Sequence, residues 1–412
     1  MTAMHQPDVN SLGGPSPAAA PRARSWIPLE GSIHLPVYLL AAFLPVRGLE
    51  SLGIAMPLPT NTVAALLLLV LALVWRPRWK FDAPLLVTVT CALLLWLVAA
   101  SLIVQGDVQP RRFFNLLSLV LIAGVIGSGR LPMRSLTRGM MMGLVIALGV
   151  SIILLPRSSY AGRLTGLLAD PNAAGYTLVT LGLGLAQSVR SVKRRWMFIA
   201  VVAAGTVLTV SRTSMFALTI GLIWVLVGRR LNAVVGALGL GGVVWLYQFT
   251  TRLAERHGLF VDRAGSDALR ERLLFEERRL VDSAGWVGHG LGSNVVQVDE
   301  STTLFFHNSY LALQSEGGRI ALGLVILLLV ALYLRYFQLP GSHRPVWSEA
   351  SLVASAICAF NIGFALTSPP FAVAVGLFLA YQGFARESLS TEGDDPMLTT
   401  RVAVSELGAS HP

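Results

Sequence analysis

Long apolar runs follow one another along most of this chain and restrict its fold more than any other feature. A helix of about twenty apolar residues spans the hydrocarbon of a bilayer. Twelve apolar runs, several of them shorter than that, cover approximately residues 33–50, 61–76, 84–104, 113–129, 136–155, 172–190, 196–210, 213–228, 231–250, 309–335, 347–367 and 370–385. Because 54% of the residues are hydrophobic and only 13% are charged, a soluble fold would leave too much apolar surface in water. The sequence therefore predicts an all-α polytopic membrane protein with about twelve transmembrane helices.

The composition between these runs divides the chain into five parts. Residues 1–32 are rich in Pro, Ala, Gly and Ser, which predicts a disordered tail. Transmembrane helices one to nine are expected within 33–250, and helices ten to twelve within 309–385. A long charged loop at 251–308 separates the two groups. Residues 386–412 are polar and unpatterned and form a second tail.

Arginine and lysine residues predict the orientation of this bundle. They concentrate in the two tails and in every second connecting segment, and the positive-inside rule assigns such segments to the cytoplasm. Both tails are then cytoplasmic and the loop at 251–308 is external. The formal net charge of +10 is on this interpretation mostly a topology signal. A nucleic-acid-binding protein would need a basic face on a soluble module, and the sequence contains none.

One segment of the external loop has a helical pattern. Ser266 is a suitable N-cap for a helix over 267–283. The apolar stripe of this helix consists of Leu269, Leu273 and Leu280, and is interrupted by Glu276 and Glu277. We expect a short helix lying at the membrane surface.

The loop ends in a histidine, His307, directly before an apolar run. An imidazole at the outer mouth of a membrane bundle is suited to proton transfer, because its charge changes near neutral pH. Either Asn308 or Ser309 can cap the helix that follows, and the cap would hold the ring on a rigid element. The alternative is an interface histidine without a role.

Arginine residues near the outer face could grip a diphosphate, because guanidinium groups bind phosphate oxygens bidentately and keep their charge. Arg163 precedes Asp170-Pro171, a pair typical of a helix start. Arg212 lies in a short turn between two runs, where it is either an interface anchor or a ligand clamp. Arg272 lies in the loop helix, where a pair with Glu276 would leave it no further role.

The sequence contains no motif for a metal or an organic cofactor. HExxH, clustered Cys and His, a Walker loop and Gly-x-Ser-x-Gly are all absent, and both cysteines lie inside apolar runs. We therefore expect metal-independent chemistry without a cofactor. Glu316 is three residues before Arg319, which is the spacing of an ion pair within one helix.

Six short motifs occur in a characteristic order between about residues 160 and 335. They are Arg163-x-x-Gly166-x-x-x-Asp170-Pro171-Asn172, Thr209-x-Ser211-Arg212-Thr213-Ser214, the helix bearing Arg272, Gly288-x-Gly290-x-Gly292, His307-Asn308-x-x-Leu311 and Glu316-x-Gly318. In this order, and with the long loop before the tenth run, the chain resembles the O-antigen ligase and O-antigen polymerase superfamily, whose shared core is called the Wzy-C region.

The resemblance implies a membrane glycosyltransferase. Such enzymes move a glycan from undecaprenyl pyrophosphate to an acceptor hydroxyl at the outer face of the bacterial plasma membrane, in one step that inverts the anomeric centre. By this resemblance His307 is the base for the acceptor proton. Arg163, Arg212 and Arg272 would bind the pyrophosphate, and the supporting residues would be Asn308, Glu316 and Asn172.

Several alternatives stay open at this point. A ligase uses a lipid A-core sugar as acceptor, whereas a polymerase for O-antigen, capsule or exopolysaccharide uses another lipid-linked repeat unit. A polyprenyl-lipid flippase or transporter would use arginines to grip a lipid phosphate without any reaction. In a structural membrane subunit the charged loop would be only a docking surface.

Overall fold

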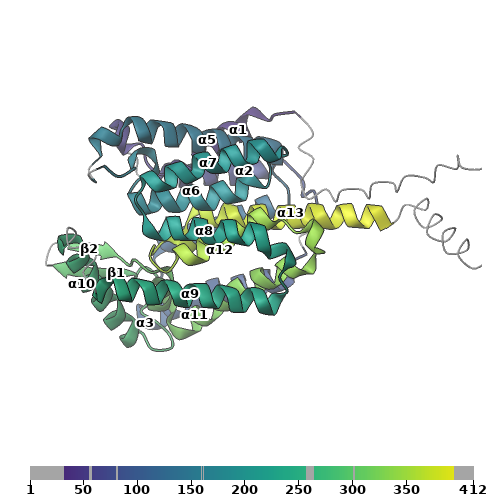
Figure 1. Ribbon diagram of the computed structural model, residues 1–412. Helices are drawn as coiled ribbons and strands as arrows, with labels where there is room; N and C mark the ends of the chain where they lie inside the picture. Colours follow the sequence, from purple (N-terminus) through teal and green to yellow (C-terminus); the bar gives the residue numbers. More distant parts are fainter. Residues whose placement is uncertain are drawn as a thin grey trace, which may run out of the picture.

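The computed structural model describes residues 32–54, 58–79, 82–158, 160, 162–256, 264–299 and 302–393. The described part is mostly helical (Figure 1). The two tails predicted at 1–32 and 386–412 lie almost wholly outside the described residues. The exceptions are Ser32 and 386–393, because the last helix continues to Gly393.

Each of the twelve apolar runs contains one helix, and a further helix lies in the charged loop. The helices are α1 (Leu35–Phe43), α2 (Thr60–Ala72), α3 (Pro84–Val104), α4 (Pro110–Gly127), α5 (Met133–Ile153), α6 (Pro171–Ala186), α7 (Val192–Leu208), α8 (Arg212–Val227), α9 (Ala233–Arg256), α10 (Ala264–Ser283), α11 (Ser309–Arg335), α12 (Val346–Cys358) and α13 (Pro369–Gly393). Within the described residues, five helices are long and apolar enough to cross a membrane: Pro84–Val104, Pro110–Gly127, Met133–Ile153, Arg212–Arg230 and Ser309–Gln338. This architecture is consistent with an all-α membrane protein.

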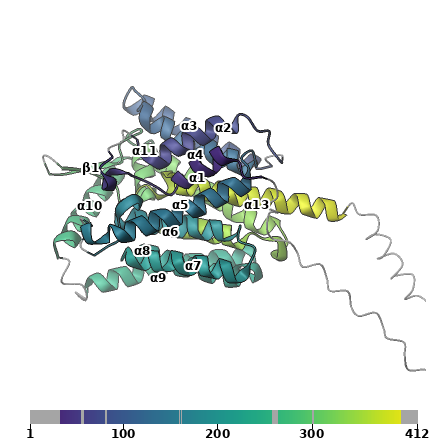
Figure 2. The same cartoon turned by 90° about the horizontal axis from the view of Figure 1, so that it is seen from above.

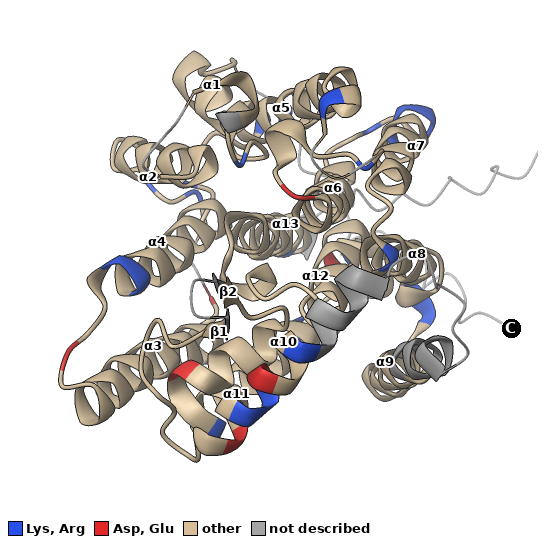
Figure 3. Ribbon diagram, turned by 90° about the vertical axis from the view of Figure 1, so that its left-hand side faces the viewer, with Lys and Arg blue, Asp and Glu red and all other residues tan. Residues whose placement is uncertain are grey.

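The most buried helices are α6, α12 and α13, which lie at the centre of the bundle when it is viewed end on (Figure 3). Small side chains let α6 and α12 approach closely. Ser351 of α12 donates a hydrogen bond of 2.6 Å to the carbonyl of Thr180 on α6, and the hydroxyls of Thr180 and Ser355 lie 3.0 Å apart. These contacts satisfy polar groups that hydrocarbon could not.

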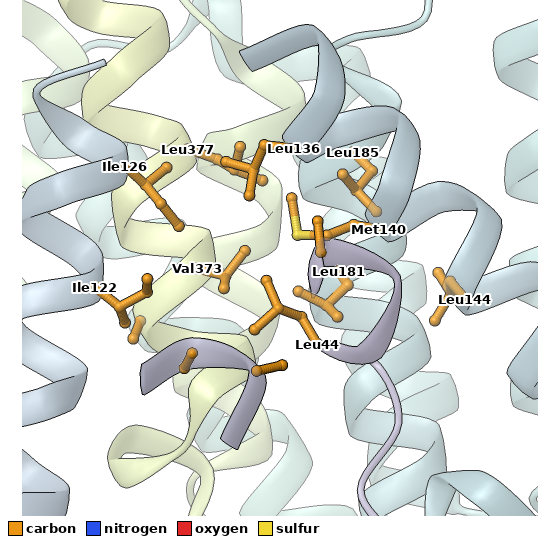
Figure 4. Close-up of a cluster of buried hydrophobic side chains, with 14 of the residues drawn as sticks. Leu44, Ile122, Ile126, Leu136, Met140, Leu144, Leu181, Leu185, Val373 and Leu377 are labelled. Carbon is orange, nitrogen blue, oxygen red and sulfur yellow. The ribbon is translucent and has the colours of Figure 1, made fainter. Parts of the chain in front are cut away.

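A second layer of apolar packing joins α1, α4 and α5 to this centre. Figure 4 shows side chains of this cluster in the space between these helices. They are Leu44, Ile122, Ile126, Leu136, Met140, Leu144, Leu181, Leu185, Val373 and Leu377. Figure 2, seen from above, shows α1, α5 and α6 as neighbouring layers.

Two of the runs expected to be spans are helical over only part of their length. The run at 33–50 contains nine helical residues in α1, about 14 Å of helix, which is too short to cross a bilayer alone. In the run at 347–367, α12 ends at Cys358, and an irregular segment follows before Pro369. Asn361 and Gly363 favour this break because both are poor helix formers.

The charged loop also contains a short β-hairpin, which was not predicted from the sequence. The strands β1 (Val295–Asp299) and β2 (Thr302–Phe305) pair antiparallel, with Val296 opposite Leu304. Alternating apolar residues favour this pairing, because one face of the ribbon packs against the protein.

The helix expected at 267–283 is part of α10, and apolar side chains of this helix pack against other elements of the protein. Leu273 and Val281 are buried in one cluster with Val296 of β1 and Ala312 of α11. Leu273 and Leu280 of the expected apolar stripe therefore pack inside the protein, and the location of this helix at a membrane surface stays a prediction. Ser266 lies within α10 and not at its start.

Candidate functional site

The sequence motifs gather at one end of the bundle. The starts of α4, α6, α8 and α11 lie at the same end as α10 and the hairpin, which is the left-hand end in Figure 1 and faces the viewer in Figure 3. Helix starts carry unpaired N–H groups and a partial positive charge. This end is therefore suited to an anion.

His307 lies against a buried glutamate, Glu277 of α10. The backbone N–H of His307 donates a hydrogen bond of 2.6 Å to Oε1 of Glu277. The same carboxylate oxygen lies 3.9 Å from Nδ1 of the imidazole. The Glu277 side chain is 0% exposed, whereas the His307 side chain is 39% exposed, so the carboxylate supports the ring from inside.

Burial raises the pKa of the Glu277 carboxyl to about 7, although the hydrogen bond from His307 and the positive charge of Arg278 oppose that rise. In water a glutamate ionises near pH 4.3, so this carboxyl changes charge in an unusual range. The sequence contained a signal for this residue, since a glutamate interrupts the apolar stripe of α10. The interruption by itself does not show which residue Glu277 faces.

Asn308 caps α11 and thereby fixes the residue before it. Its Oδ1 accepts hydrogen bonds from the backbone N–H groups of Tyr310 at 2.9 Å and Leu311 at 3.2 Å. Of the two candidate caps, Asn308 is thus the one used. The hydroxyl of Ser309 instead donates to the carbonyl of Ile362 at 2.6 Å.

The irregular segment after α12 supports the residues around His307. The backbone N–H of Ser309 donates to the carbonyl of Ala359 at 2.8 Å. Gly363 lies so close to the backbone of Phe306 and His307 that a Cβ atom at this position would overlap the carbonyl of Phe306. Such irregular backbone is tolerated inside a membrane bundle where protein groups satisfy it.

Arg47, which follows α1, is a cation that sequence reasoning missed. Its guanidinium lies 3.9 Å from the centre of the Phe364 ring. Its Nη1 is buried and has no hydrogen-bond partner among the residues that the structure describes. The residue escaped notice because it lies within the apolar run at 33–50.

Arg163 and Arg212 belong to segments that the fold brings together. Nε of Arg163 donates to the carbonyl of Thr209 at 3.0 Å, and the N–H of Leu164 donates to the carbonyl of Leu208 at 2.9 Å. The segment at 163–164 therefore lies along the turn that ends at Arg212, the exposed first residue of α8. Val210 in this turn has a φ of 51°, a left-handed conformation that is uncommon outside glycine.

The helix start at Asp170-Pro171 is confirmed. Oδ1 of Asp170 accepts hydrogen bonds from the N–H groups of Asn172 at 3.0 Å and Ala173 at 3.1 Å. Asn172 is thus held at the first turn of α6, where its side chain is half-buried. Close by, Gly175 lies so near Ser214 of α8 that a Cβ atom would be only 2.5 Å from the hydroxyl oxygen.

Arg272 lies on α10, five residues before Glu277, and is exposed. The expected alternative partner, Glu276, instead forms an ion pair with Arg279 at 3.4 Å. Because Glu277 faces inward while Arg272 faces outward, the two residues lie on different sides of the helix.

Glu316 is bound to Arg112 of α4 and not to Arg319, so the pair expected within one helix is wrong. Its two carboxylate oxygens accept from Nε of Arg112 at 2.8 Å and from Nη2 at 3.0 Å. The Glu316 side chain is 0% exposed. Arg319 lies over the ring of Trp286, 5.5 Å from its centroid. A helix of 27 residues in a bundle offers partners from other helices, and the bidentate one is stronger.

The turn that contains Gly288, Gly290 and Gly292 is fixed on a kink of α11. All three glycines are left-handed, and so is Gly318 in the kink. The N–H of Gly290 donates to the carbonyl of Glu316 at 3.0 Å, and the N–H of Gly292 donates to Oε1 of Glu316 at 3.1 Å. Glu316 therefore ties three separate segments together.

The described residues contain no group of three or more His, Cys, Asp or Glu side chains arranged to hold a metal ion. The side chains that gather at this end include His307 with its carboxylate, His289 in the glycine turn and several arginines. This combination can move a proton and bind an anion.

No protein-family model matches the chain, and a search of curated proteins finds no significant match. The fold alone gives the class: the described residues are mostly helical, and five of their helices are long and apolar enough to cross a membrane. Any more specific function has to be argued from the residues at this end of the bundle.

Proposed function

We propose that this protein is a multi-pass glycosyltransferase of the bacterial plasma membrane that transfers a glycan from undecaprenyl pyrophosphate to an acceptor hydroxyl at the outer face. One observation carries the proposal. His307 stands on a capped helix start and is supported by the buried carboxylate of Glu277. A histidine held in this way is suited to act as a general base.

In this mechanism the neutral imidazole directs its Nδ1–H toward Glu277, which leaves Nε2 to accept a proton. Nδ1 is buried while 39% of the side chain is exposed, so the opposite edge of the ring faces the acceptor. As Nε2 takes the hydroxyl proton, the acceptor oxygen forms a bond to the anomeric carbon. The bond from that carbon to the pyrophosphate oxygen breaks, and the leaving pyrophosphate keeps the electron pair.

The arginines would bind the donor and neutralise the charge that develops on the leaving group. Arg163 and Arg212 are the strongest candidates, because their segments are hydrogen-bonded neighbours at the end of the bundle that carries His307. Arg47 joins them as a half-buried cation, linked through Phe364 to the segment beneath His307. Arg272 is a further candidate, on the same helix as Glu277, whose carboxylate binds the backbone of His307.

Asn308 and Glu316 support the site in different ways under this proposal. Asn308 would orient His307 directly through the helix cap. Glu316 would act at a distance, by fixing α4 and the glycine turn to α11. Asn172 would contribute a side-chain amide at the start of α6 near the donor.

The acceptor decides between two versions of the activity. The primary version is a ligase that uses lipid A-core, and the alternative is a polymerase that uses a second lipid-linked repeat. In a deletion strain, long polymer left on the carrier with bare lipid A-core would identify a ligase. Single repeat units without long chains would identify a polymerase.

Purified protein incubated with a lipid-linked glycan and an acceptor tests the chemistry itself. We expect transfer by the wild type and by His343→Ala, whose histidine lies at the opposite end of the bundle, and none by His307→Ala. Transfer by His307→Ala at the wild-type rate would refute the assignment of the base. If the wild type binds the lipid without transferring the glycan, a flippase or transporter becomes the better interpretation.

A further inference from the structure

A large apolar cavity runs along the bundle, from Leu313 and Leu366 near the start of α11 to Arg78 and Arg130 at the opposite end. Helix α3 packs on α11, and α4 packs on α13; Figure 3 shows these helices end on. Residues of all four helices line a cavity of about 750 Å³. This volume is in the range of ligand pockets, roughly 300–1,000 Å³. Val87 and Leu121 line the cavity and are also 46% and 48% exposed, so the cavity opens sideways where lipid would surround the protein.

The cavity has one cationic end. Arg78 and Arg130 line it there, beside Trp79 and the last residues of α4. Helix α4 begins near Arg112 and Glu316, at the end of the bundle that carries His307, so its last residues lie at the opposite end. The positive-inside rule assigns this opposite end to the cytoplasm.

The guanidinium groups of Arg78 and Arg130 form no ion pair with an acidic side chain of the described residues. Arg78 is exposed and lies 5.7 Å from the centre of the Trp79 ring, and Arg130 is half-buried. Neither side chain forms a hydrogen bond or ion pair with another described residue. The carbonyls at the end of α4 are already occupied, since Gly127 accepts from Trp79 Nε1 at 2.6 Å.

Acidic side chains nearby do not neutralise these cations. A second cavity of about 520 Å³ shares Arg78 and Trp79 with the first, and its charged lining residues are Arg78, Asp82, Arg335, Arg386 and Glu387. Arg386 binds the Asp82 carboxylate at 2.8 Å, and Arg335 donates to the Asp82 carbonyl at 2.9 Å. Across both cavities the cations Arg78, Arg130, Arg335 and Arg386 outnumber the anions Asp82 and Glu387.

We propose that the cavity between α3, α4, α11 and α13 is a binding site for an anionic phospholipid, with an acyl chain in the apolar interior and the phosphate between Arg78 and Arg130. An apolar cavity that opens sideways suits a chain, and basic residues at the cytoplasmic end suit an anionic headgroup. A zwitterionic lipid would gain less from these charges. The cationic residues of the cavity lie at the end opposite His307, so this phosphate site is separate from the proposed pyrophosphate site. This proposal is independent of the proposed function.

The test measures lipid binding by the full-length chain purified in mild detergent. Phosphatidylglycerol or phosphatidylcholine is added in mixed micelles, and the melting temperature and the lipids retained after washing are measured. We expect phosphatidylglycerol to raise the melting temperature and to be retained, with little effect of phosphatidylcholine. In the variant Arg78→Gln/Arg130→Gln the affinity for phosphatidylglycerol should fall about thirtyfold, since each basic residue near an anionic lipid contributes roughly fivefold.

Matched variants control for charge and for folding. Arg76→Gln removes a charge from the same connecting segment but outside both cavities, and should bind as the wild type does. Val87→Trp fills the cavity and should reduce retention of phosphatidylglycerol, whereas Leu95→Trp, on the exposed side of α3, should not. Three outcomes would overturn the proposal. The double arginine variant could bind phosphatidylglycerol as tightly as the wild type does, or phosphatidylcholine could stabilise the protein as much as phosphatidylglycerol does. The third is retention of a polyprenyl phosphate in place of phospholipid.

Discussion

One carboxylate oxygen of Glu277 accepts the backbone N–H of His307 at 2.6 Å and lies 3.9 Å from Nδ1 of the same residue. The carboxylate therefore binds the backbone of His307 and lies close to its ring. Glu277 is a positioning residue in the proposed reaction, because it would act on the substrate only through the histidine.

Replacing Glu277 with Gln should slow glycan transfer while preserving the fold. The amide oxygen still accepts the N–H of His307, but the side chain no longer carries a charge to orient the imidazole. We expect the rate to fall by about tenfold to a hundredfold, which is part of the roughly 10²–10⁴-fold contribution of a general base. In the wild type the rate should rise as the pH passes about 7, where Glu277 ionises. The variant should lack that rise, and an unchanged pH profile would contradict the role of Glu277.

The same substitution should change how stability depends on pH. Burial raises the pKa of Glu277 to about 7 in the folded protein, above the value near 4.3 of an exposed glutamate. The protonated carboxyl therefore favours the folded state below about pH 4, and this advantage is lost as the pH rises through 7. Relative to Glu277→Gln, the wild type should lose melting temperature between pH 5 and pH 8. Parallel melting curves over that interval would show that the carboxyl is not perturbed.

Replacing Gly363 with Ala should disturb the site without touching a charged group. The added methyl group would overlap the carbonyl of Phe306, so the segments at 306–307 and 363–364 have to move apart. We expect a loss of about 1–3 kcal/mol in the free energy of unfolding and a clear loss of transfer activity. Gly323→Ala is the matched control, since nothing lies within 4 Å of a Cβ atom there. Thermal melting and transfer rate are the measurements, and equal behaviour of the two variants would argue against the packing contact.

Removing only one partner of the ion pair between Arg112 and Glu316 should strongly lower the free energy of unfolding. Arg112→Met leaves a buried carboxylate without its partner, which costs about 3–5 kcal/mol. The double variant Arg112→Met/Glu316→Leu should be more stable than Arg112→Met, because it removes the uncompensated charge as well. Melting temperatures of the wild type, the two single variants and the double variant give the coupling energy. Additive effects would mean that the pair contributes little.

The role of Arg272 can be separated from a general effect of charge. If Arg272 binds the donor pyrophosphate, Arg272→Gln should raise the KM for the donor by about tenfold, as expected for the loss of a charge-assisted contact. Arg279→Gln removes a charge from the same helix, where Arg279 is 72% exposed and paired with Glu276, and should leave KM unchanged. If both variants behave as the wild type does, the pyrophosphate is held by Arg163, Arg212 and Arg47 without a cation from α10.

Local sequence signals predicted the parts of the site that depend on neighbouring residues. Asp170 and Asn308 cap their helices as expected, because a cap is formed between residues two or three positions apart. Long-range partners could not be predicted in this way. Glu316 binds Arg112 from a helix 204 residues earlier, although Arg319 was available at helical spacing.

The sequence by itself determined where the helices form, because each apolar run has to satisfy its own backbone hydrogen bonds before it meets any partner. It did not determine which runs stay helical throughout, as the ends of α1 and α12 show. Only the tertiary structure decided that the irregular segment after α12 lies beneath His307 and that Glu277 of α10 faces that histidine. These relationships depend on how distant segments pack against one another. A single sequence carries periodicity and capping signals within an element, whereas the contacts between elements arise only when the whole bundle is closed.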